Sequence, residues 1–372
     1  MAKRVMLAVA GAGKTYMLCH AIDPAKKNLI LAYTHENIRN ICNELVQRFG
    51  CVPALTNVLT FDSFVYRYIL RPYEPMILGI FNQQSYAMRG ITIAKPPAQS
   101  ILRNKRWLRN PSCPTKDKFE HYTKNGFYYN DTLPELLVYA QEKAKVLDKA
   151  ADALNKTYSQ IMIDEFQDFR EYDFDLIVAI AKRIENIVLV GDYYQHSVSA
   201  VNNTGKPFKK SKGYLSYDEF IALLTKNRFL VDNTTLSASR RCPQKICDFV
   251  ASKLGIPITA NNEHTGEVIW LTPETIPSIF ENNQVPKLVF SEAQKYSFKA
   301  INWSYSKGDT MDSVCVVLTD DLSNMDDETF SVAGLSGITI NKLYVALTRT
   351  KGDLFLVKQK DFKKVKQRYL IK

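Results

Sequence analysis

The chain has 372 residues, of which 46% are hydrophobic and 11% aromatic, and it carries a formal net charge of +11 at pH 7. This composition excludes a disordered chain and allows two ordinary cores with a smaller insertion. The positive charge favours a polyanionic partner, nucleic acid before a membrane surface, because the sequence contains no long apolar span and no lipid-anchor motif.

Cysteine and histidine are too scattered to build a metal site. The seven cysteines include no Cys-x-x-Cys pair, and the five histidines show no metal-ligand spacing. We therefore expect no zinc or iron–sulfur centre. The same scatter favours a reducing, intracellular setting such as the cytoplasm.

The first predicted element is an apolar strand at residues 5–9 that leads into a glycine-rich segment. Residues 8–15 read Ala-Val-Ala-Gly-Ala-Gly-Lys-Thr, and the start of a helix follows. This order is typical of a phosphate-binding loop, in which small residues let backbone N–H groups surround a phosphate. We expect Lys14 to contact the β- and γ-phosphates of ATP and the Thr15 hydroxyl to bind Mg²⁺. The alternative is a strand-to-helix turn without a ligand. The expected nucleotide-binding positions of the loop are Ala10, Gly11, Ala12, Gly13, Lys14, Thr15 and Tyr16.

Strands and helices alternate in the next part of the chain. Apolar runs at residues 28–34, 58–64, 160–163 and 186–190 predict strands, and helical patterns follow them. This alternation predicts an α/β fold, in which helices cover both faces of a parallel sheet.

The alternation stops between about residues 72 and 130, where prolines interrupt it and aromatic residues mix with basic ones. The candidates for nucleic-acid contact in this segment are Arg103, Lys105, Arg106 and Trp107. An indole can stack on a base while neighbouring cations neutralise phosphates. The alternative is a solvated helical face whose tryptophan packs inward. Residues 132–135, Thr-Leu-Pro-Glu, predict a capping box with a proline near the start of the following helix.

Two of the predicted strands end in polar side chains. Asp164 and Glu165 follow residues 160–163, and Gln195 comes shortly after residues 186–190. We expect Asp164 to bind Mg²⁺ and Glu165 to orient and deprotonate an attacking water at the edge of the sheet. The amide of Gln195 would bond the γ-phosphate or that water and lose the contact after hydrolysis. The alternatives are surface charge and an ordinary loop glutamine.

A second alternation of strands and helices begins near residue 230. It predicts strands around residues 268–270, 287–290, 312–318 and 352–357, and hence a second α/β domain.

Arg241 and Arg349 lie in this second domain. An arginine delivered across a domain boundary stabilises the charge of a transferring phosphoryl group, so both are candidate catalytic residues. The alternative for each is a structural salt bridge.

In this order the motifs resemble those of superfamily 1 helicases, most closely the UvrD/Rep-like branch. The most specific segments are residues 164–168 (Asp-Glu-Phe-Gln-Asp), 190–195 (Val-Gly-Asp-Tyr-Tyr-Gln) and 344–349 (Tyr-Val-Ala-Leu-Thr-Arg). The resemblance implies two RecA-like parallel-sheet domains in tandem, a phosphate-loop NTPase fold with a mainly helical insertion in the first domain. ATP would lie between the domains, and single-stranded nucleic acid would cross their tops. The implied division is residues 1–64 with 151–228 for the first domain, 65–150 for the insertion and 229–372 for the second domain.

The resemblance also assigns residues outside the phosphate loop. The implied nucleic-acid contacts are Thr34, Asn37, Thr60, Phe61, Ser304 and Ser306. Arg240 takes the place of an aromatic residue that stacks on adenine in the family, and its planar guanidinium can stack instead. Gly308 belongs to the fifth motif and is a further nucleotide-binding candidate; the continuation of that motif looks more like viral helicases. The family's aromatic wedge after Gln195 is missing from residues 196–200.

We therefore expect an ATP-dependent nucleic-acid helicase or translocase that uses ATP and Mg²⁺. The resemblance implies single-stranded DNA in preference to RNA, and movement from 3′ to 5′. Replication, repair or recombination proteins are the expected partners, and no membrane contact is expected. Three alternatives stay open: a nucleic-acid-stimulated ATPase that remodels complexes without unwinding, a phosphate-loop kinase for a small molecule, and a binding module that has lost hydrolysis.

Overall fold

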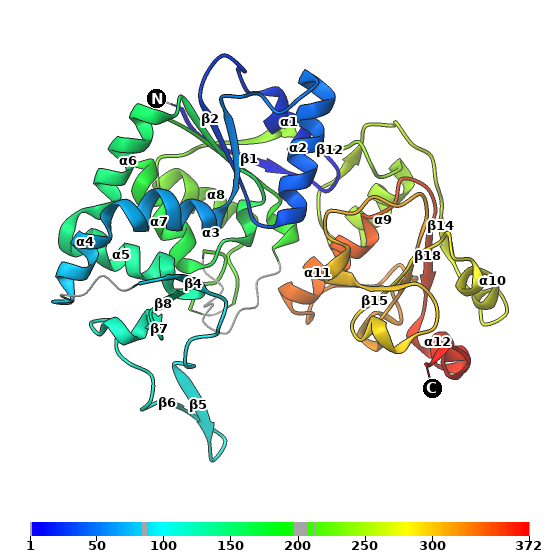
Figure 1. The fold of residues 1–372 in the computed structure, drawn as a ribbon. Helices are drawn as coiled ribbons and strands as arrows, with labels where there is room; N and C mark the ends of the chain where they lie inside the picture. The colour runs from blue at the N-terminus through cyan, green and yellow to red at the C-terminus, as the bar shows by residue number, and fades with distance from the viewer. Residues whose placement is uncertain (1, 84–87, 197–206, 212, 372) are drawn as a thin grey trace. The chain divides into compact units, whose positions relative to one another are not determined.

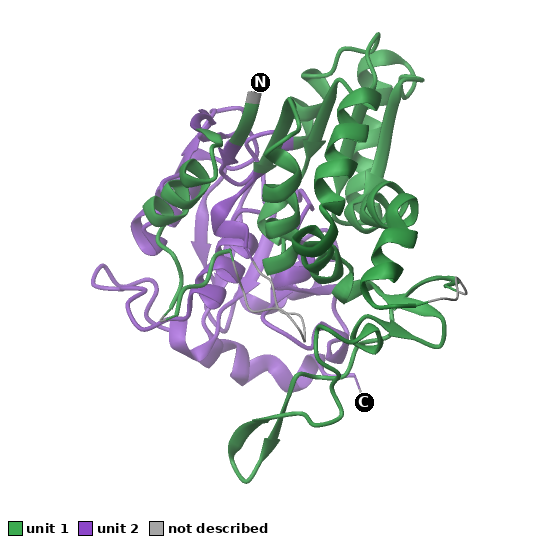
Figure 2. Cartoon of the chain, turned by 90° about the vertical axis from the view of Figure 1, so that its left-hand side faces the viewer, with its two compact units in different colours: residues 1–5, 15–190, 198–231 green, residues 6–14, 191–197, 232–372 purple. Residues whose placement is uncertain are grey.

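A computed structural model describes residues 2–83, 88–196, 207–211 and 213–371. The chain divides into two compact units, coloured green and purple in Figure 2. The first unit comprises residues 1–5, 15–190 and 198–231, and the second comprises residues 6–14, 191–197 and 232–372. The glycine-rich loop therefore groups with the second unit, although the strand before it begins in the first. Among the described residues, no helix has the length and apolar character that crossing a membrane requires.

A six-stranded sheet organises the N-terminal half of the chain (Figure 1). Its spatial order is β11 (Leu230–Leu236), β1 (Ala2–Ala8), β10 (Asn186–Gly191), β9 (Gln160–Ile163), β2 (Asn28–Ala32) and β3 (Thr56–Thr60). The neighbours from β10 to β3 pair in parallel. All five residues of β2 are buried, which is the pattern of a strand covered on both faces. The strands predicted from the apolar runs are confirmed, except that residues 61–64 form a short helix instead of continuing β3.

Helices connect these strands, as expected for parallel neighbours. They are α1 (Lys14–His20), α2 (His35–Phe49), α5 (Leu133–Ala144), α6 (Val146–Thr157), α7 (Glu171–Ala181) and α8 (Tyr217–Lys226). The ends of α2 show why the chain folds this way locally. The Thr34 hydroxyl accepts the backbone N–H of Asn37 at 3.1 Å, and Gly50 ends the helix with a φ of +78°.

The segment between β3 and β9 combines helices with two small sheets. It begins with α3 (Phe61–Phe64), a π-helical turn η1 (Val65–Leu70) and α4 (Arg71–Ile80). A three-stranded sheet follows, in the order β4 (Gly90–Thr92), β8 (Phe127–Tyr129) and β7 (Thr123–Lys124). β5 (Ser100–Arg103) and β6 (Arg106–Arg109) form a separate antiparallel hairpin. The predicted break in the alternation of strands and helices is confirmed, and it reflects this change of architecture.

The start of α5 differs from the prediction. The proline lies in the first turn as expected, but Thr132 makes no side-chain cap, and its hydroxyl donates to the Tyr129 carbonyl at 3.4 Å. The Glu135 carboxylate turns to Lys116 and His121, at 2.8 Å and 3.2 Å. The capping-box prediction was wrong because Glu135 is buried and bonds groups from an earlier part of the chain instead of its own helix start.

The second unit contains a five-stranded parallel sheet. Its order is β14 (Val268–Trp270), β18 (Leu354–Val357), β17 (Val314–Val317), β15 (Lys287–Val289) and β16 (Ala300–Asn302). The main helices of the unit are α9 (Gln244–Leu254), α10 (Ile276–Glu281), α11 (Gly337–Leu347) and α12 (Gln359–Val365). A short parallel pair, β12 (Ala238–Ser239) and β13 (Thr259–Ala260), lies beside α9. The predicted fold class, two parallel-sheet α/β domains in tandem, is confirmed.

Candidate active site

The loop between β1 and α1 has the backbone of a phosphate-binding turn. Gly11 and Gly13 have φ values of +73° and +85°, which side chains other than glycine adopt only at a cost. α1 begins at Lys14, directly after the loop, and Tyr16 in its first turn stacks on His20 at 3.7 Å between ring centroids. The predicted order of strand, loop and helix is confirmed.

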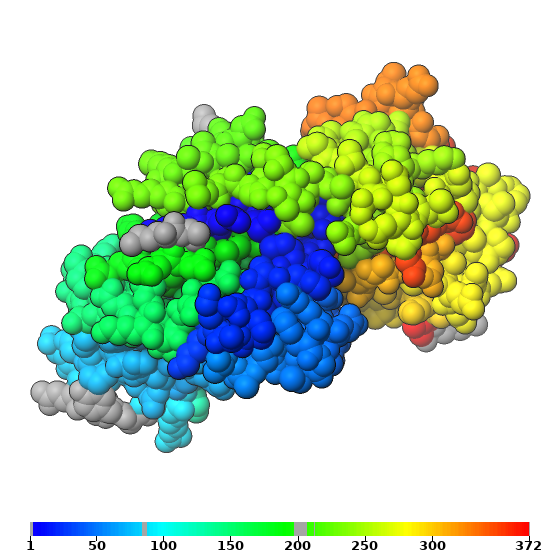
Figure 3. All heavy atoms as spheres, turned by 90° about the horizontal axis from the view of Figure 1, so that it is seen from above, coloured from blue at the N-terminus to red at the C-terminus, as the bar shows by residue number. Residues whose placement is uncertain are grey.

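Three backbone groups of the loop are bonded to later residues of the second unit. The N–H of Val9 donates to the Leu236 carbonyl at 2.9 Å, and Figure 3 shows the dark-blue start of the chain beside the yellow-green residues of that segment. The N–H of Ala10 donates to the Tyr344 hydroxyl at 2.8 Å. The carbonyl of Gly11 accepts the backbone N–H of Arg240 at 2.9 Å. The loop is therefore held from the segment before α9 and from α11.

Gly11 is required by packing as well as by its φ. A Cβ at this position would lie 2.6 Å from the Cβ of Arg241 and 2.7 Å from the hydroxyl of Ser239. The structure thus brings the predicted residues Arg240 and Arg241 against the phosphate loop.

Thr15 and Asp164 meet as predicted for a pair that binds Mg²⁺. The Thr15 hydroxyl donates to Oδ2 of Asp164 at 3.2 Å, and the Asp164 side chain is buried at the end of β9. Neighbouring oxygens around octahedral Mg²⁺ are about 2.9 Å apart, since each lies about 2.0–2.1 Å from the ion. The hydroxyl and the carboxylate therefore fit two adjacent positions of such an ion. The described residues contain no cluster of three or more His, Cys, Asp or Glu side chains that could hold a metal. The remaining ligands of the ion would be phosphates and water.

Glu165 is held in an unusual conformation beside this pair. Its φ is +56°, and its backbone N–H donates to Oδ1 of Asp164 at 2.9 Å. Its carboxylate accepts a hydrogen bond from the side-chain amide of Gln167, which is fully buried. A non-glycine residue in the left-handed region costs energy and persists where its surroundings impose it. The contact with Gln167 orients the carboxylate, although sequence reasoning did not assign Gln167 a role.

Gln195 ends the short 3₁₀ helix η5 (Tyr193–Gln195), which follows β10, and its side chain is buried. Asp192 caps this turn by accepting the N–H of Tyr194 at 3.0 Å. Gln195 therefore lies shortly after the end of β10, in the turn that follows the strand. Residues 197–200, which contain most of the segment lacking the aromatic wedge, lie outside the described residues.

The two candidate arginines of the second unit differ in their surroundings. Arg241 is partly exposed and donates to the Thr310 hydroxyl at 2.9 Å and to the Thr348 carbonyl at 3.2 Å. Arg349 is 1% exposed, and its guanidinium donates to the Val345 carbonyl at 2.7 Å and to the Ser306 carbonyl at 3.5 Å. These bonds tie Arg349 to η7 (Trp303–Ser306) and to the last turn of α11, the helix that precedes it. Its role as an arginine finger stays a prediction.

Tyr344 is, after Gln167, a second residue of this site that sequence reasoning missed. It was quoted as part of the segment that ends at Arg349, but it received no role. Its hydroxyl is fully buried, and burial raises the pKa of Tyr344 well above the ordinary value, so the group is neutral and accepts the Ala10 N–H. The sequence offered one signal for Tyr344, its place in the specific motif that ends at Arg349. The contact itself could not be read from the sequence, because it joins residues 334 positions apart.

The predicted nucleic-acid contacts of the first unit lie where β2 and β3 end. The strands pair in register, with Ala32 opposite Thr60, so the residues after them share one edge of the sheet. Thr34 and Asn37 are bonded to each other there. Thr60 caps α3, whereas Phe61 is 2% exposed and packs on Phe169 with a centroid distance of 4.8 Å.

In the second unit, the predicted contacts Ser304 and Ser306 both belong to η7. Ser304 is half-buried, and the fully buried Ser306 donates its hydroxyl to the Trp303 carbonyl at 2.8 Å. Gly308 follows with a φ of +91°. Direct contact of Phe61 or Ser306 with a ligand would require these buried groups to become accessible.

The basic cluster around Trp107 forms the β5–β6 hairpin. Arg103, Lys105, Arg106 and Trp107 are all exposed, with Trp107 70% exposed. The alternative of a helical face with an inward tryptophan is wrong, because the segment forms two strands and the indole faces solvent.

Comparison with known families and proteins gives two sequence matches. The family model for the UvrD/REP helicase N-terminal domain matches residues 99–197. A putative ATP-dependent DNA helicase, YjcD, from Bacillus subtilis (strain 168) is 22% identical over 228 residues, which is 50% of this chain and 30% of that protein. This chain thus matches under a third of the length of that relative. The resemblance to UvrD-like superfamily 1 helicases, inferred from the motifs, is confirmed.

Three solved structures of viral helicases are among the similar chains. Arterivirus nonstructural protein 10 (helicase) is 12% identical with a TM-score of 0.45, covering 95% of this chain and 59% of its own. Its complex with DNA gives 14% identity, the same TM-score, and coverage of 95% and 60%. The PRRSV helicase is 13% identical with a TM-score of 0.45, covering 98% of this chain and 54% of its own.

Proposed function

We propose that this chain is an ATP-dependent nucleic-acid helicase or translocase, because residues 99–197 match the family model for the UvrD/REP helicase N-terminal domain and the motifs resemble those of UvrD-like superfamily 1 helicases. It hydrolyses ATP and uses the cycle to move along a single strand, DNA in preference to RNA and from 3′ to 5′. The observation that carries the proposal is the Thr15 hydroxyl at 3.2 Å from the Asp164 carboxylate, directly after a glycine turn with two positive φ values.

The residues of the site have distinct roles in this proposal. Thr15 and Asp164 hold Mg²⁺, which neutralises phosphate charge when bound. Glu165 holds an attacking water and takes its proton, and Gln167 fixes the direction of that carboxylate. Lys14 and the loop N–H groups bind the phosphates, and Arg241 and Arg349 are the candidates for stabilising charge during transfer.

The deciding experiment measures ATP turnover with single-stranded DNA, with single-stranded RNA and with neither. Stimulation by DNA supports the proposal, and turnover indifferent to both polymers supports a small-molecule kinase. A strand-displacement assay on duplexes with a 3′ or a 5′ tail then tests unwinding and direction. Stimulated turnover without displacement assigns the chain to ATPases that move or remodel complexes without separating strands.

Glu165→Gln and Lys14→Ala test the assigned chemistry. Both variants should lose turnover, whereas Glu165→Gln should still bind ATP, because it keeps the loop and the metal pair. The matched control is Glu185→Gln, an exposed glutamate beyond α7, which should turn over ATP like the parent. Normal hydrolysis in Glu165→Gln would assign the water to another base.

A further inference from the structure

The β5–β6 hairpin is an exposed element with a defined orientation. Its two-residue turn, Asn104–Lys105, has φ values of +48° and +60°, which is the twist-matched turn of a two-residue hairpin. The hairpin extends away from the β4–β8–β7 sheet in Figure 1. A two-stranded hairpin has too little core to be stable alone, so exposed apolar residues on it call for an explanation.

The strand register divides the hairpin into two faces. Trp107 lies opposite Leu102, and Arg109 lies opposite Ser100, so these four side chains share one face. Leu102 is 59% exposed, which places two large apolar side chains side by side in solvent. This face therefore offers a flat apolar surface with a cation two residues further along the strand.

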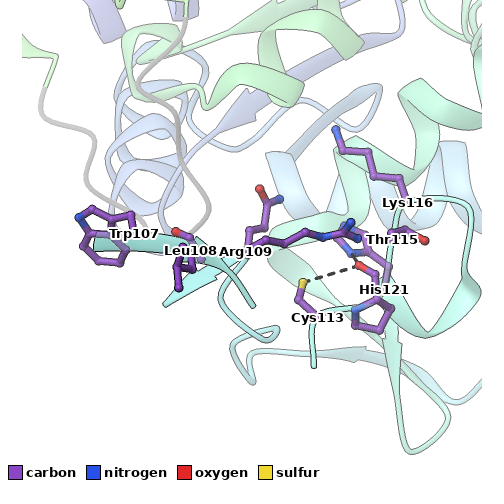
Figure 4. Close-up of a pocket in the computed structure, with 10 residues that line it drawn as sticks. Trp107, Leu108, Arg109, Cys113, Thr115, Lys116 and His121 are labelled. Carbon is purple, nitrogen blue, oxygen red and sulfur yellow. Dashed lines mark hydrogen bonds between the residues drawn. The ribbon is translucent and has the colours of Figure 1, made fainter. Parts of the chain in front are cut away.

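A cavity of about 530 Å³ lies beside the hairpin (Figure 4), and it is lined by three residues of this face and by Leu108 of the other face, but not by Leu102. Ser100, Trp107 and Arg109 line one side, and Cys113, Lys116 and His121 line the other. Figure 4 shows the Arg109 side chain directed toward Cys113 and His121, with Trp107 at the opposite end. The volume falls within the range of small-ligand pockets, about 300–1,000 Å³.

The far wall of the cavity is fixed by buried contacts. His121 is 5% exposed; its Nδ1 lies 2.9 Å from the Pro114 carbonyl and its Nε2 3.2 Å from the Glu135 carboxylate. Lys116 places its ammonium 2.8 Å from the same carboxylate and 4.7 Å from the centroid of the Tyr172 ring. Lys116 is therefore already paired, and the wall keeps its shape without a ligand.

The segment that forms the near wall is positively charged, and Arg109 is the basic residue of this segment that lines the cavity. Residues 95–109 contain five basic and no acidic side chains: Lys95, Arg103, Lys105, Arg106 and Arg109. In the part of the chain that the structure describes, the guanidinium of Arg109 has neither an ion pair nor a hydrogen bond; Asp117 interacts with it electrostatically without pairing, so its hydrogen-bond donors remain available to an anion. An apolar plane and a cation beside one cavity match a base and its phosphate.

We propose that this cavity binds one unpaired nucleotide of a single strand, with its base stacked on Trp107 and its phosphate against Arg109. The inference rests on the proposed function and adds a nucleotide subsite outside the two parallel sheets. An unpaired base is required because the bases of a duplex stack on each other and do not present a free face to an indole.

Tryptophan fluorescence provides the first readout. Besides Trp107, the chain has the fully buried Trp303 and the partly buried Trp270. Adding an oligothymidylate at low salt, without ATP, should quench emission in the parent and in Trp270→Phe, but not in Trp107→Phe. A blunt duplex of the same length should bind without this quenching. Equal quenching by the duplex, or quenching that persists in Trp107→Phe, overturns the proposal.

Affinity for a labelled oligothymidylate provides the second readout. Trp107→Ala should weaken binding about 5- to 150-fold, and Trp107→Phe should restore most of it, because a phenyl ring still stacks. Arg109→Ala should lower the salt dependence by about one phosphate contact. The matched control is Ile93→Ala, an exposed apolar residue that does not line the cavity, and it should bind like the parent.

The two proposals fail in different ways. Parent protein whose ATP turnover ignores single strands contradicts the proposed function. Parent protein that is stimulated, while Trp107→Ala binds the oligonucleotide within twofold of the parent, contradicts the subsite alone. In that case the exposed indole and leucine belong to a surface for a protein partner.

Discussion

At the scale of single residues, Gly11 shows how tightly the phosphate loop is packed. Two separate constraints act on Gly11: its positive φ and the lack of space for a Cβ beside Arg241. Another glycine of the chain has a positive φ but no such steric constraint. Gly50 has a φ of +78°, and a Cβ there would meet nothing within 4 Å. A comparison of the two positions therefore separates backbone strain from steric overlap.

Gly50→Ala should cost about 1–2 kcal/mol of stability, the usual penalty of a left-handed alanine. Gly11→Ala should cost that amount and about 1–3 kcal/mol more for overpacking, and it should also abolish ATP turnover, because the loop must move away from Arg241. Chemical denaturation and an ATPase assay provide the measurements. Equal destabilisation of the two variants would mean that the contact with Arg241 yields easily.

Tyr344→Phe removes one oxygen and leaves the buried Ala10 N–H without its acceptor. We expect a loss of about 1–3 kcal/mol in stability without nucleotide. ATP with Mg²⁺ should raise the melting temperature more in this variant than in the parent, because phosphate oxygens can replace the missing acceptor. Tyr369→Phe is the control, since no hydrogen bond of its hydroxyl occurs within the described residues. A melting temperature of Tyr344→Phe equal to that of the control would show that the bond contributes nothing.

These residues also show what the sequence can predict at this scale. Lys14, Thr15 and the strand end at Asp164 follow from local order, because a glycine turn between a strand and a helix fixes its own geometry. Tyr344 and Gln167 could not be assigned in this way. Their roles arise from contacts that only the folded chain creates.

At the scale of elements, the β5–β6 hairpin was the segment most open to misinterpretation. Its basic composition was correctly recognised, but its period was not decisive, because four residues per strand are too few to separate alternation from a helical face. The prediction of a capping box at the start of α5 was wrong for the opposite reason. Its Thr-x-x-Glu pattern was clear, yet a buried carboxylate bonded Lys116 and His121 more favourably than its own helix start.

The basic residues of the hairpin lead to a prediction about how the affinity for a single strand depends on salt concentration. Changing Arg103, Lys105, Arg106 and Arg109 together to alanine should reduce the slope of log affinity for a single strand against log salt by about three, at roughly 0.7 per phosphate contact. Titrations at several salt concentrations measure the slope directly. A slope that stays the same would mean that the four cations remain solvated in the complex.

At the scale of the whole molecule, the fold class was predictable because alternating strands and helices leave few architectures. The division of the chain into two compact units was harder to predict. Residues 6–14 follow the contacts of the phosphate loop and group with residues 232–372, although β1 pairs in the other sheet. Chain order alone does not reveal such a grouping.

Because each of the two compact units has its own hydrophobic core, we expect the chain to unfold in more than one step. Phe280 is buried in the second unit against Phe298 and Phe362, and Phe64 is buried in the first unit against Phe61 and Tyr68. Each change to alanine should cost about 3–5 kcal/mol and lower a different calorimetric transition. If both variants lower one shared transition, the two units unfold together.

The hydrogen bond from Ala10 to Tyr344 has a consequence for turnover kinetics. In the proposed ATP cycle, the Tyr344 hydroxyl would take the place of a phosphate oxygen at this N–H, so a departing phosphate would not leave the Ala10 amide without an acceptor. Nucleotide exchange would then replace one oxygen by another at this amide, and its rate would depend on how readily the Tyr344 side chain moves.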